Sequence, residues 1–203
     1  MSAELIDGNM LAEEINREVT AEASRLAAAG RKVRLVAVQV GENPASKIYT
    51  NMQAKSCEAV GIEYTLLTLA DATTQADLLA KIAGLNADRT VTGIILQMPL
   101  PKQIDARKVQ VAIAPEKDVE GMHPVNMGRL FFGGGHVAPC TPMAAVALLK
   151  KTCPKLAGKE VVVIGHSEIV GKPIAMMLLE SPNESPTVTV CHVATKDLAA
   201  HTR

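Results

Sequence analysis

Residues 33–69 read "VRLVAVQVGENPASKIYTNMQAKSCEAVGIEYTLLTL", and the order of patterns in this stretch decides the fold class. "VRLVAVQV" is an apolar run of strand length that ends at Gly41. After the loop "GENPAS", a helix is expected to run to about residue 60, with Gly61 after its end. "IEYTLLTL" is expected to be the next strand. A strand, a helix and a second strand in this order predict a parallel sheet with a right-handed crossover.

The same alternation continues on both sides of this stretch. Helices are expected at residues 8–29, about 74–86, 104–114, 140–152 and 170–180, with further strands at "VTGIILQ", "EVVVIG" and "TVTVCH". The segment at 114–126 is polar and rich in turn residues, so we expect a loop there. The chain is therefore predicted to be an α/β protein with parallel sheets.

A break between two domains is expected where Gly, Pro and His residues gather, between residues 120 and 142. The part after the break holds only two expected strands. A doubly wound nucleotide-binding sheet needs more strands than that to cover its helices. We therefore expect the second domain to be incomplete.

Composition argues against several classes of function. Lys and Arg total 21, as do Asp and Glu, so no basic excess points to nucleic acid and no charge run points to a membrane surface. No apolar run reaches membrane-spanning length. The four cysteines form no C-x-x-C pair, which predicts a reduced, cytoplasmic compartment. The five histidines are scattered, so no metal site is expected.

The stretch "VVVIGHSEIVGKP", residues 161–173, carries the first candidate binding pattern. An apolar strand runs into Gly165, Ser167 follows, and Gly171 opens a helix. Backbone amides and the helix N-terminus of such a turn can meet a phosphate. The spacing departs from the dinucleotide fingerprint G-x-G-x-x-G. A plain strand-turn-helix without a ligand therefore explains these residues as well as a cofactor site does.

Three further stretches hold polar groups that could serve a site. "PEKDVEGMHPVN" has four ionisable residues within 116–120, for which a solvated loop is the default interpretation. Gln97 ends the strand of "GIILQMPLP", where ligands of open sheets bind, although a structural hydrogen bond is the commoner role. In "IYTNMQAKSC", Tyr49 and Gln53 share a helix face. Lys55 lies about 200° around the helix from Gln53 and is expected on the surface.

Together these stretches resemble one family. "VGENPASKIYTNMQAKSCEAVGIEY", "GIILQMPLP", "PEKDVEGMHPVNMGRL", "PCTP" and "VVVIGHSEIVGKP" look like methylenetetrahydrofolate dehydrogenase/methenyltetrahydrofolate cyclohydrolase, the bifunctional enzyme of one-carbon metabolism. They occur in the family's order and cover nearly the whole chain. The resemblance implies an N-terminal three-layer α/β catalytic domain, residues 1–138. An incomplete Rossmann-like NAD(P)-binding domain, residues 139–203, would follow, in a chain truncated at its C-terminal side.

The resemblance also implies two linked reactions. The dehydrogenase transfers a hydride from 5,10-methylenetetrahydrofolate to NADP or NAD. The cyclohydrolase then adds water to the methenyl cation and opens it to 10-formyltetrahydrofolate. The implied catalytic residues around the folate are Tyr49, Gln53, Gln97 and Glu120. The implied cofactor-binding residues are Thr141, Gly165, His166, Ser167, Gly171, Pro173 and His192. A homodimer is implied as well.

Two pocket positions depart from the family pattern. Gln53 stands where the family has a catalytic lysine, and Glu120 stands where the motif K-D-V-D-G has the aspartate that holds the pterin ring. A lysine can transfer protons, whereas a glutamine amide hydrogen-bonds but does not titrate. We therefore expect Gln53 to affect the cyclohydrolase more than the dehydrogenase. The alternative function is a truncated, catalytically inactive folate-binding paralogue or a gene fragment.

The cofactor residues also depart from the family pattern. His166 stands where the family commonly has arginine, and Val193 stands where it commonly has Ser or a basic residue. Neither Val193 nor Ala194 offers a side-chain donor to the 2′-phosphate of NADP. The strand end also lacks an acidic residue that would hold the free ribose hydroxyls of NAD. We expect the preference for NADP, the family default, to be lost.

Overall fold

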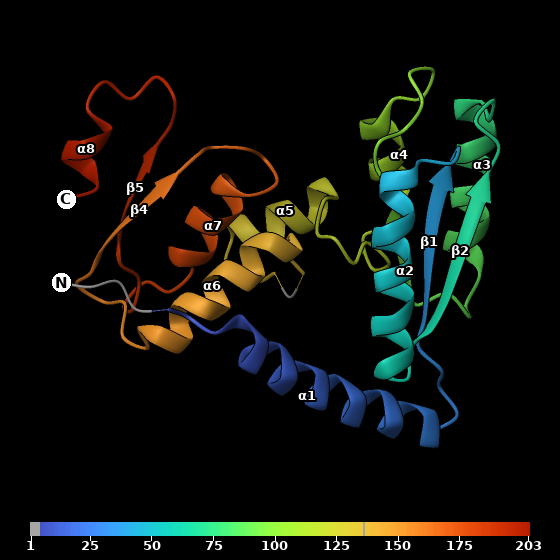
Figure 1. The fold of residues 1–203 in the computed structure, drawn as a ribbon, viewed down its shortest axis with the longest axis horizontal. Helices are drawn as coiled ribbons and strands as arrows, with labels where there is room; N and C mark the ends of the chain where they lie inside the picture. The colour runs from blue at the N-terminus through green and yellow to red at the C-terminus, as the bar shows by residue number, and fades with distance from the viewer. Residues whose placement is uncertain (1–4, 136) are drawn as a thin grey trace. The chain divides into compact units, whose positions relative to one another are not determined.

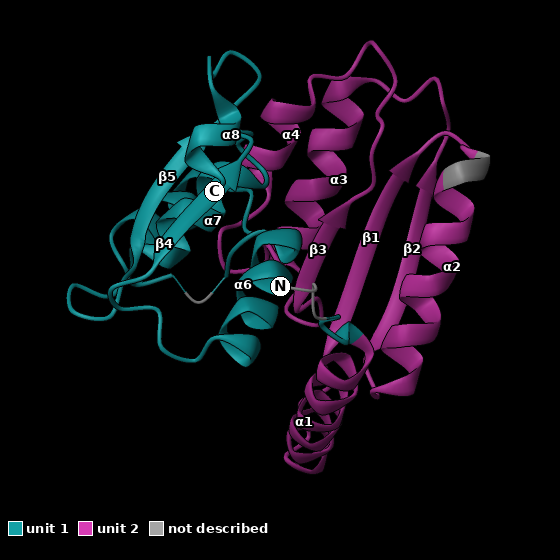
Figure 2. Ribbon diagram, turned by 60° about the vertical axis from the view of Figure 1, so that its left-hand side comes forward, with its two compact units in different colours: residues 1–8, 120–203 teal, residues 9–119 magenta. Residues whose placement is uncertain are grey.

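The computed structural model describes residues 5–135 and 137–203, and of residues 44 and 45 the backbone alone. The chain forms two compact units, shown in Figures 1 and 2. The N-terminal unit is Asn9–Val119, and the C-terminal unit is Glu120–Arg203 with Met1–Gly8. Each has its own parallel sheet and its own hydrophobic core, which confirms the predicted α/β class. The domain limits 1–138 and 139–203 stay predictions.

The sheet of the N-terminal unit has three parallel strands in the order β2-β1-β3. These strands are β1 (Arg34–Val40), β2 (Glu63–Leu69) and β3 (Gly93–Leu96). The helices that accompany them are α1 (Gly8–Ala28), α2 (Pro44–Ala59), α3 (Gln75–Ala87) and α4 (Ala106–Ala112). The pairing register sets Leu35 of β1 opposite Tyr64 on one side and Gly93 on the other.

One face of this sheet holds the hydrophobic core. Side chains alternate between the two faces along a strand, so every second residue of β1 points to the same side. The core consists of buried aliphatic side chains from β1, β3, α3, α4 and the segments beside them: Val36, Val38, Val40, Leu78, Ile82, Val91, Ile94, Leu96, Ile104, Val109 and Ile113. Burial of each large side chain contributes about 1.5–3 kcal/mol, so this face fixes α3 and α4 on the sheet.

The opposite face of the sheet is covered by α2 and is more polar. Ala37 is fully buried there, and Val119 packs against Gly93 so closely that a Cβ at Gly93 would lie 2.4 Å from its Cγ1. Tyr64 of β2 lies on the same face and donates a hydrogen bond to Gln53 of α2. The sheet therefore lies between α2 on one side and α3 with α4 on the other, as the predicted three-layer arrangement requires.

The C-terminal unit contains a parallel two-stranded sheet, β4 (Glu160–Ile164) and β5 (Thr187–Cys191). Its helices are α5 (Pro124–Phe131), α6 (Cys140–Thr152), α7 (Gly171–Leu178) and α8 (Leu198–His201). Val146 of α6, Val163 of β4 and Leu178 of α7 form the centre of its core, together with Leu156. A strand, a turn, a helix and a parallel strand in this order begin a Rossmann-like fold, as predicted.

The helix α5 lies partly where the sequence predicted a loop, so that prediction is wrong for residues 124–126. His123 caps the helix, since its Nδ1 accepts a hydrogen bond of 3.1 Å from the amide of Val125. Pro124 occupies the first helical position, where its missing N–H has no intrahelical partner to lose. The proline that indicated a loop is therefore a helix-starting residue here.

Candidate active site

The face of α2 that carries Tyr49 and Gln53 also carries Cys57, because residues four apart on a helix are neighbours. Tyr49 is 58% exposed, Gln53 is half-buried and Cys57 is buried, so this face passes from the surface into the unit. Lys55 is exposed. The prediction that this lysine lies on the surface is therefore confirmed.

Gln97 meets this face of α2 from the end of β3. Its backbone amide donates to the carbonyl of Val38 at 2.8 Å, which extends the pairing with β1 by one residue. Its side chain is only 6% exposed, and its Nε2 donates to Oε1 of Gln53 at 2.7 Å. The structure thus brings together two of the four predicted folate residues by a direct hydrogen bond.

Tyr64 is a third member of this cluster, and the sequence reasoning missed it. Its hydroxyl donates to the same Oε1 of Gln53 at 3.2 Å. Burial raises the pKa of the Tyr64 hydroxyl above its usual range, and interactions with Cys57 and Tyr49 add to the rise. The available signal was the two-residue period of the strand, which puts Tyr64 on the face opposite to the core.

The loop before Glu120 is anchored, so the prediction of a solvated loop is wrong for part of it. The Nζ of Lys117 donates to the carbonyls of Leu85 and Asp88, at 2.8 and 2.6 Å, at the end of α3. Asp118 is only 4% exposed and forms an isolated parallel bridge with Ile94 of β3.

Glu120 is half-buried and begins the C-terminal unit. The next residue, Gly121, has a φ of +66°. A Cβ at that position would lie 2.6 Å from a backbone atom of Ala138. Only glycine fits there, which fixes the path of the chain just after Glu120.

The C-terminal unit places five of its predicted cofactor residues around one turn. This turn lies between β4 and α7, and the residues are Gly165, His166, Ser167, Gly171 and His192. The amides of Val170 and Gly171 donate to Oγ of Ser167 at 3.1 and 3.4 Å, so the turn has an internal cap. A Cβ on Gly171 would lie 2.0 Å from the carbonyl oxygen of Gly165, which leaves no room for any side chain.

Two imidazoles stand at the carboxyl ends of the two strands. The rings of His166 and His192 are tilted with their centroids 4.5 Å apart, and both residues are exposed. The amide of Gly165 donates to the carbonyl of Cys191 at 2.7 Å, which joins the two strand ends. Ligands of open α/β sheets bind beyond this end of the strands.

The remaining two predicted cofactor residues differ in exposure. Thr141 is exposed in the first turn of α6, whereas Pro173 is fully buried in the first turn of α7. A buried Pro173 can place the turn but presents no surface to a ligand.

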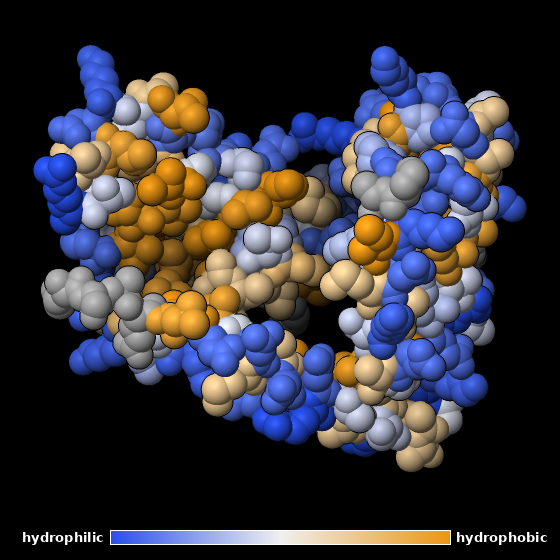
Figure 3. Space-filling view, in the orientation of Figure 1, coloured by the Kyte–Doolittle hydropathy of each residue, from blue (hydrophilic) through white to orange (hydrophobic). Residues whose placement is uncertain are grey.

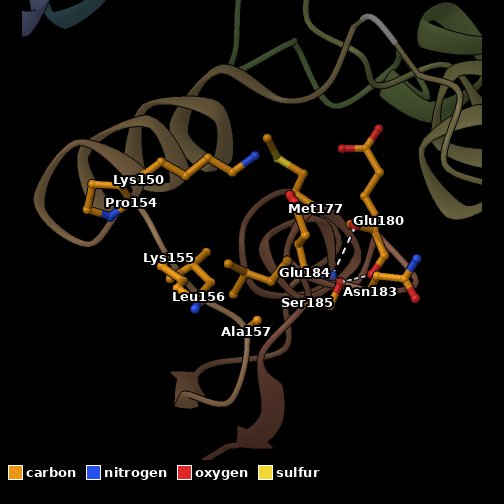
Figure 4. Close-up of a pocket in the computed structure, with 12 residues that line it drawn as sticks. Lys150, Pro154, Lys155, Leu156, Ala157, Met177, Glu180, Asn183, Glu184 and Ser185 are labelled. Carbon is orange, nitrogen blue, oxygen red and sulfur yellow. Dashed lines mark hydrogen bonds between the residues drawn. The ribbon is translucent and has the colours of Figure 1, made fainter.

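A cavity of 620 Å³ also lies in the C-terminal unit, shown in Figure 4. It is lined by Leu156 and Ala157, which precede β4, and by Ser185, which precedes β5. Glu184 and Ser181 also line it, and the amide of Glu184 donates to Oγ of Ser181 at 3.2 Å. The cavity therefore lies at the amino ends of the strands, opposite to the end where such sheets bind cofactors.

Within residues 5–135 and 137–203, no cluster of three or more His, Cys, Asp or Glu side chains could hold a metal ion. The same residues contain no helix long and apolar enough to cross a membrane.

Comparison with known proteins places this geometry in a family. The model of the tetrahydrofolate dehydrogenase/cyclohydrolase catalytic domain matches residues 6–120, and that of its NAD(P)-binding domain matches residues 139–203. The bifunctional protein FolD of Geotalea daltonii is 50% identical over 198 residues, which is 98% of this chain and 70% of that protein. The chain belongs to the tetrahydrofolate dehydrogenase/cyclohydrolase family.

Solved structures of this family have the same fold. The bifunctional FolD enzyme of Campylobacter jejuni superposes with a TM-score of 0.92 at 41% identity, over 98% of this chain and 70% of that one. The Trypanosoma brucei dehydrogenase-cyclohydrolase, complexed with NADP and an inhibitor, gives a TM-score of 0.88 at 34% identity, over 99% of this chain and 69% of that one. The Geotalea protein and the Campylobacter enzyme are both bifunctional FolD proteins, and the Trypanosoma protein is a dehydrogenase-cyclohydrolase.

Proposed function

We propose that this protein oxidises 5,10-methylenetetrahydrofolate to 5,10-methenyltetrahydrofolate with NADP or NAD, and hydrolyses the product to 10-formyltetrahydrofolate. The observation that carries the proposal is the hydrogen bond between Gln97 and Gln53 at the carboxyl end of β3, in a chain of this family. It joins two positions that the family motifs assign to the folate pocket.

The proposed folate residues hold and orient the folate substrate. The exposed ring of Tyr49 is available to stack on the pterin region or to hydrogen-bond with it. Gln97 orients the reacting end, and the carboxylate of Glu120 accepts from the amino edge of the pterin. Hydride transfer requires close, aligned carbon atoms and no protein acid or base, so these roles suffice for the dehydrogenase step.

The glycine turn of the C-terminal unit fits a dinucleotide. NAD(P) supplies the hydride acceptor when it is bound. Because Gly171 carries no side chain and opens α7, the backbone and the helix N-terminus can approach a pyrophosphate. We assign His166 and His192 to the ribose side of the cofactor, and Ser167 and Pro173 to the shape of the turn. Thr141 is assigned to the cofactor from the family motif alone.

The hydrolysis step depends more heavily on residue 53. Opening the methenyl ring requires proton transfers, for which the family lysine is suited and the Gln53 amide is not. Water at the pocket must exchange those protons without help from this side chain. We therefore assign the protein a cyclohydrolase activity that is weak relative to its dehydrogenase activity.

The proposed assembly is a cytoplasmic homodimer formed through the C-terminal unit. Figure 3 shows apolar side chains gathered on the surface over β4 and β5, and Ile164 at the end of β4 is 62% exposed. Apolar patches of this kind mark interaction surfaces. Light scattering coupled to size-exclusion chromatography should give twice the mass of one chain, and a monomer would contradict the assignment.

The proposed function is tested by assaying the two reactions separately. The purified protein is mixed with 5,10-methylenetetrahydrofolate and either NADP or NAD, and the reduced cofactor is followed by absorbance. Hydrolysis of 5,10-methenyltetrahydrofolate is followed in the absence of the cofactor. Gln97→Leu should lower the dehydrogenase rate by about 10²-fold, because it removes a polar group from the site of charge development.

The matched control is Lys55→Ala, which changes an exposed side chain of the same helix and should leave both rates unchanged. Absence of cofactor reduction with both NADP and NAD would contradict the proposed function.

A further inference from the structure

The cluster on the sheet face beneath α2 has an unusual pattern of donors. Oε1 of Gln53 accepts two hydrogen bonds, from Nε2 of Gln97 at 2.7 Å and from the hydroxyl of Tyr64 at 3.2 Å. Among the residues that the structure describes, these are the hydrogen bonds of the Gln53 and Gln97 side chains. The carbonyl end of Gln53 is therefore saturated.

This pattern fixes what the two glutamines offer to a ligand. With its oxygen occupied, Gln53 has the two N–H donors of Nε2 left. Gln97 uses Nε2 toward Gln53, so the opposite end of its planar amide, Oε1, is left as an acceptor. The pair presents one donor group and one acceptor group with defined identities.

The two glutamines alone could form the same bond in either direction. If both amides turned by 180°, Nε2 of Gln53 would donate to Oε1 of Gln97, and the identities would be exchanged. The reversed arrangement would leave the proton of Tyr64 without its acceptor. A part-buried phenol normally finds a hydrogen-bond partner, and an unpaired buried donor is costly. Tyr64 therefore selects the observed direction.

Tyr64 lies on the sheet face that α2 covers, and its hydroxyl reaches Gln53 there. Ala37, a small and fully buried residue, lies on the same sheet face as Tyr64, which the pairing register sets beside Leu35 of β1. Because burial raises the pKa of the Tyr64 hydroxyl, the group keeps its proton and stays a donor over the neutral range.

We propose that Tyr64 is a positioning residue of the dehydrogenase, which acts through Gln53 to direct the Oε1 atom of Gln97 toward the reacting end of the folate. This inference rests on the proposed function. Loss of a hydride leaves the methenyl carbon and its two nitrogens with a positive charge. A carbonyl oxygen held toward that charge stabilises it as it develops, whereas an N–H group would oppose it.

The test is a double-mutant cycle of Tyr64→Phe and Gln53→Met. Phenylalanine keeps the ring and removes the hydroxyl, and methionine keeps the length of Gln53 and removes its acceptor. In the protein with Gln53, Tyr64→Phe should lower the dehydrogenase kcat by about two- to tenfold with little change in the KM for 5,10-methylenetetrahydrofolate. In the Gln53→Met background it should lower kcat by less than twofold, because no amide is left to direct.

Thr68→Val is the matched control, since it removes a hydroxyl from the same strand and should leave kcat unchanged. Each variant is also titrated with tetrahydrofolate by calorimetry, a readout that does not need turnover. Equal losses of kcat from Tyr64→Phe in both backgrounds would show that Tyr64 has a general structural role. That result would overturn the positioning role of Tyr64 and leave the proposed dehydrogenase function standing.

If no variant reduces NAD(P) but all bind tetrahydrofolate, the dehydrogenase function fails, and with it the part of the inference that concerns the reaction. In that case the dissociation constant for tetrahydrofolate still tests the coupling between Tyr64 and Gln53. A change of twofold or more on Tyr64→Phe that vanishes in the Gln53→Met background would support the coupling. Absence of both turnover and binding would overturn both proposals.

Discussion

The two units of this protein build their candidate sites from different material. In the N-terminal unit, the site consists of side chains, with Gln53, Gln97 and Tyr64 held by hydrogen bonds to one amide oxygen. In the C-terminal unit, it consists mainly of backbone, where the carbonyl of Gly165 comes so close to Gly171 that no Cβ fits on Gly171.

This difference determines which substitutions each site can tolerate. A site made of side chains changes its chemistry when one residue changes, while its geometry is kept by the sheet and the helix around it. A site made of backbone keeps its chemistry through most substitutions but loses its shape when a required glycine is replaced. The replacement of the family lysine by Gln53 is a change of the first kind.

The largest expected effect is a gain of chemistry in the site made of side chains. Gln53→Lys should raise the cyclohydrolase rate by about 10²–10⁴-fold, because it supplies a group that can transfer protons to and from the opening ring. The dehydrogenase rate should change by a smaller factor, since hydride transfer needs no such group. Both rates are measured on the same preparation.

Lys55 offers the control for this substitution, because it already places an ammonium two residues away on an exposed side of α2. The double variant Gln53→Lys with Lys55→Gln should keep the increase in the cyclohydrolase rate. Strong cyclohydrolase activity in the protein with Gln53 unchanged would show that no lysine is needed.

A smaller effect is expected from damage to the site made of backbone. The Cβ of Gly171→Ala would lie 2.0 Å from the carbonyl oxygen of Gly165, so the turn must open. A displacement of about 1 Å at such a site can cost 10²-fold, and we expect that loss in kcat/KM for NADP and for NAD. Steady-state kinetics with each cofactor measure it.

Gly84→Ala is the control for this prediction. Gly84 is exposed in α3 with no atom within 4 Å of the position of a Cβ, and alanine favours helix. Cofactor kinetics should be unchanged in that variant. If Gly171→Ala kept its kcat/KM, the close approach at the turn would have no part in cofactor binding.

The smallest expected effect comes from adding a charged side chain to the site made of backbone in the C-terminal unit. His166→Arg should raise the preference for NADP over NAD by about tenfold, because a guanidinium binds a phosphate with paired, charge-assisted hydrogen bonds. The ratio of kcat/KM for the two cofactors measures the change. His201→Arg adds the same charge in α8 and should leave the ratio as it was. A hundredfold preference for NADP in the unchanged protein would contradict the loss of preference expected from His166 and Val193.

Much of the fold could be predicted from local patterns. The strands and most helices follow from apolar periodicity, and glycines such as Gly61 mark their ends. The helix α5 was missed because Pro124 has opposite meanings in a loop and at the first position of a helix. The capping hydrogen bond of His123 marks Pro124 as the start of a helix, and the sequence does not reveal this bond.

The site was predictable to a different extent. The departure at Gln53 is visible in the sequence, because the residues around it match the family without a gap. The contact of Gln53 with Tyr64, eleven positions apart in the sequence, is not visible, because the period of β2 gives the face of Tyr64 but not the helix that covers this face. The anchoring of Lys117 likewise depends on a helix end about thirty residues away.

The anchoring of Lys117 has a consequence for local unfolding. Its ammonium holds two carbonyls at the end of α3, and its own carbonyl accepts from the amide of Ile94 in β3. We therefore expect the last turn of the helix, the strand and this loop to open together in one cooperative event instead of separately. In hydrogen exchange, the amides of Ile94 and Asp118 would share one opening free energy. The chain thus leaves the N-terminal unit from an ordered anchor, and the conformational entropy of the segment before Glu120 is lost on folding rather than on binding.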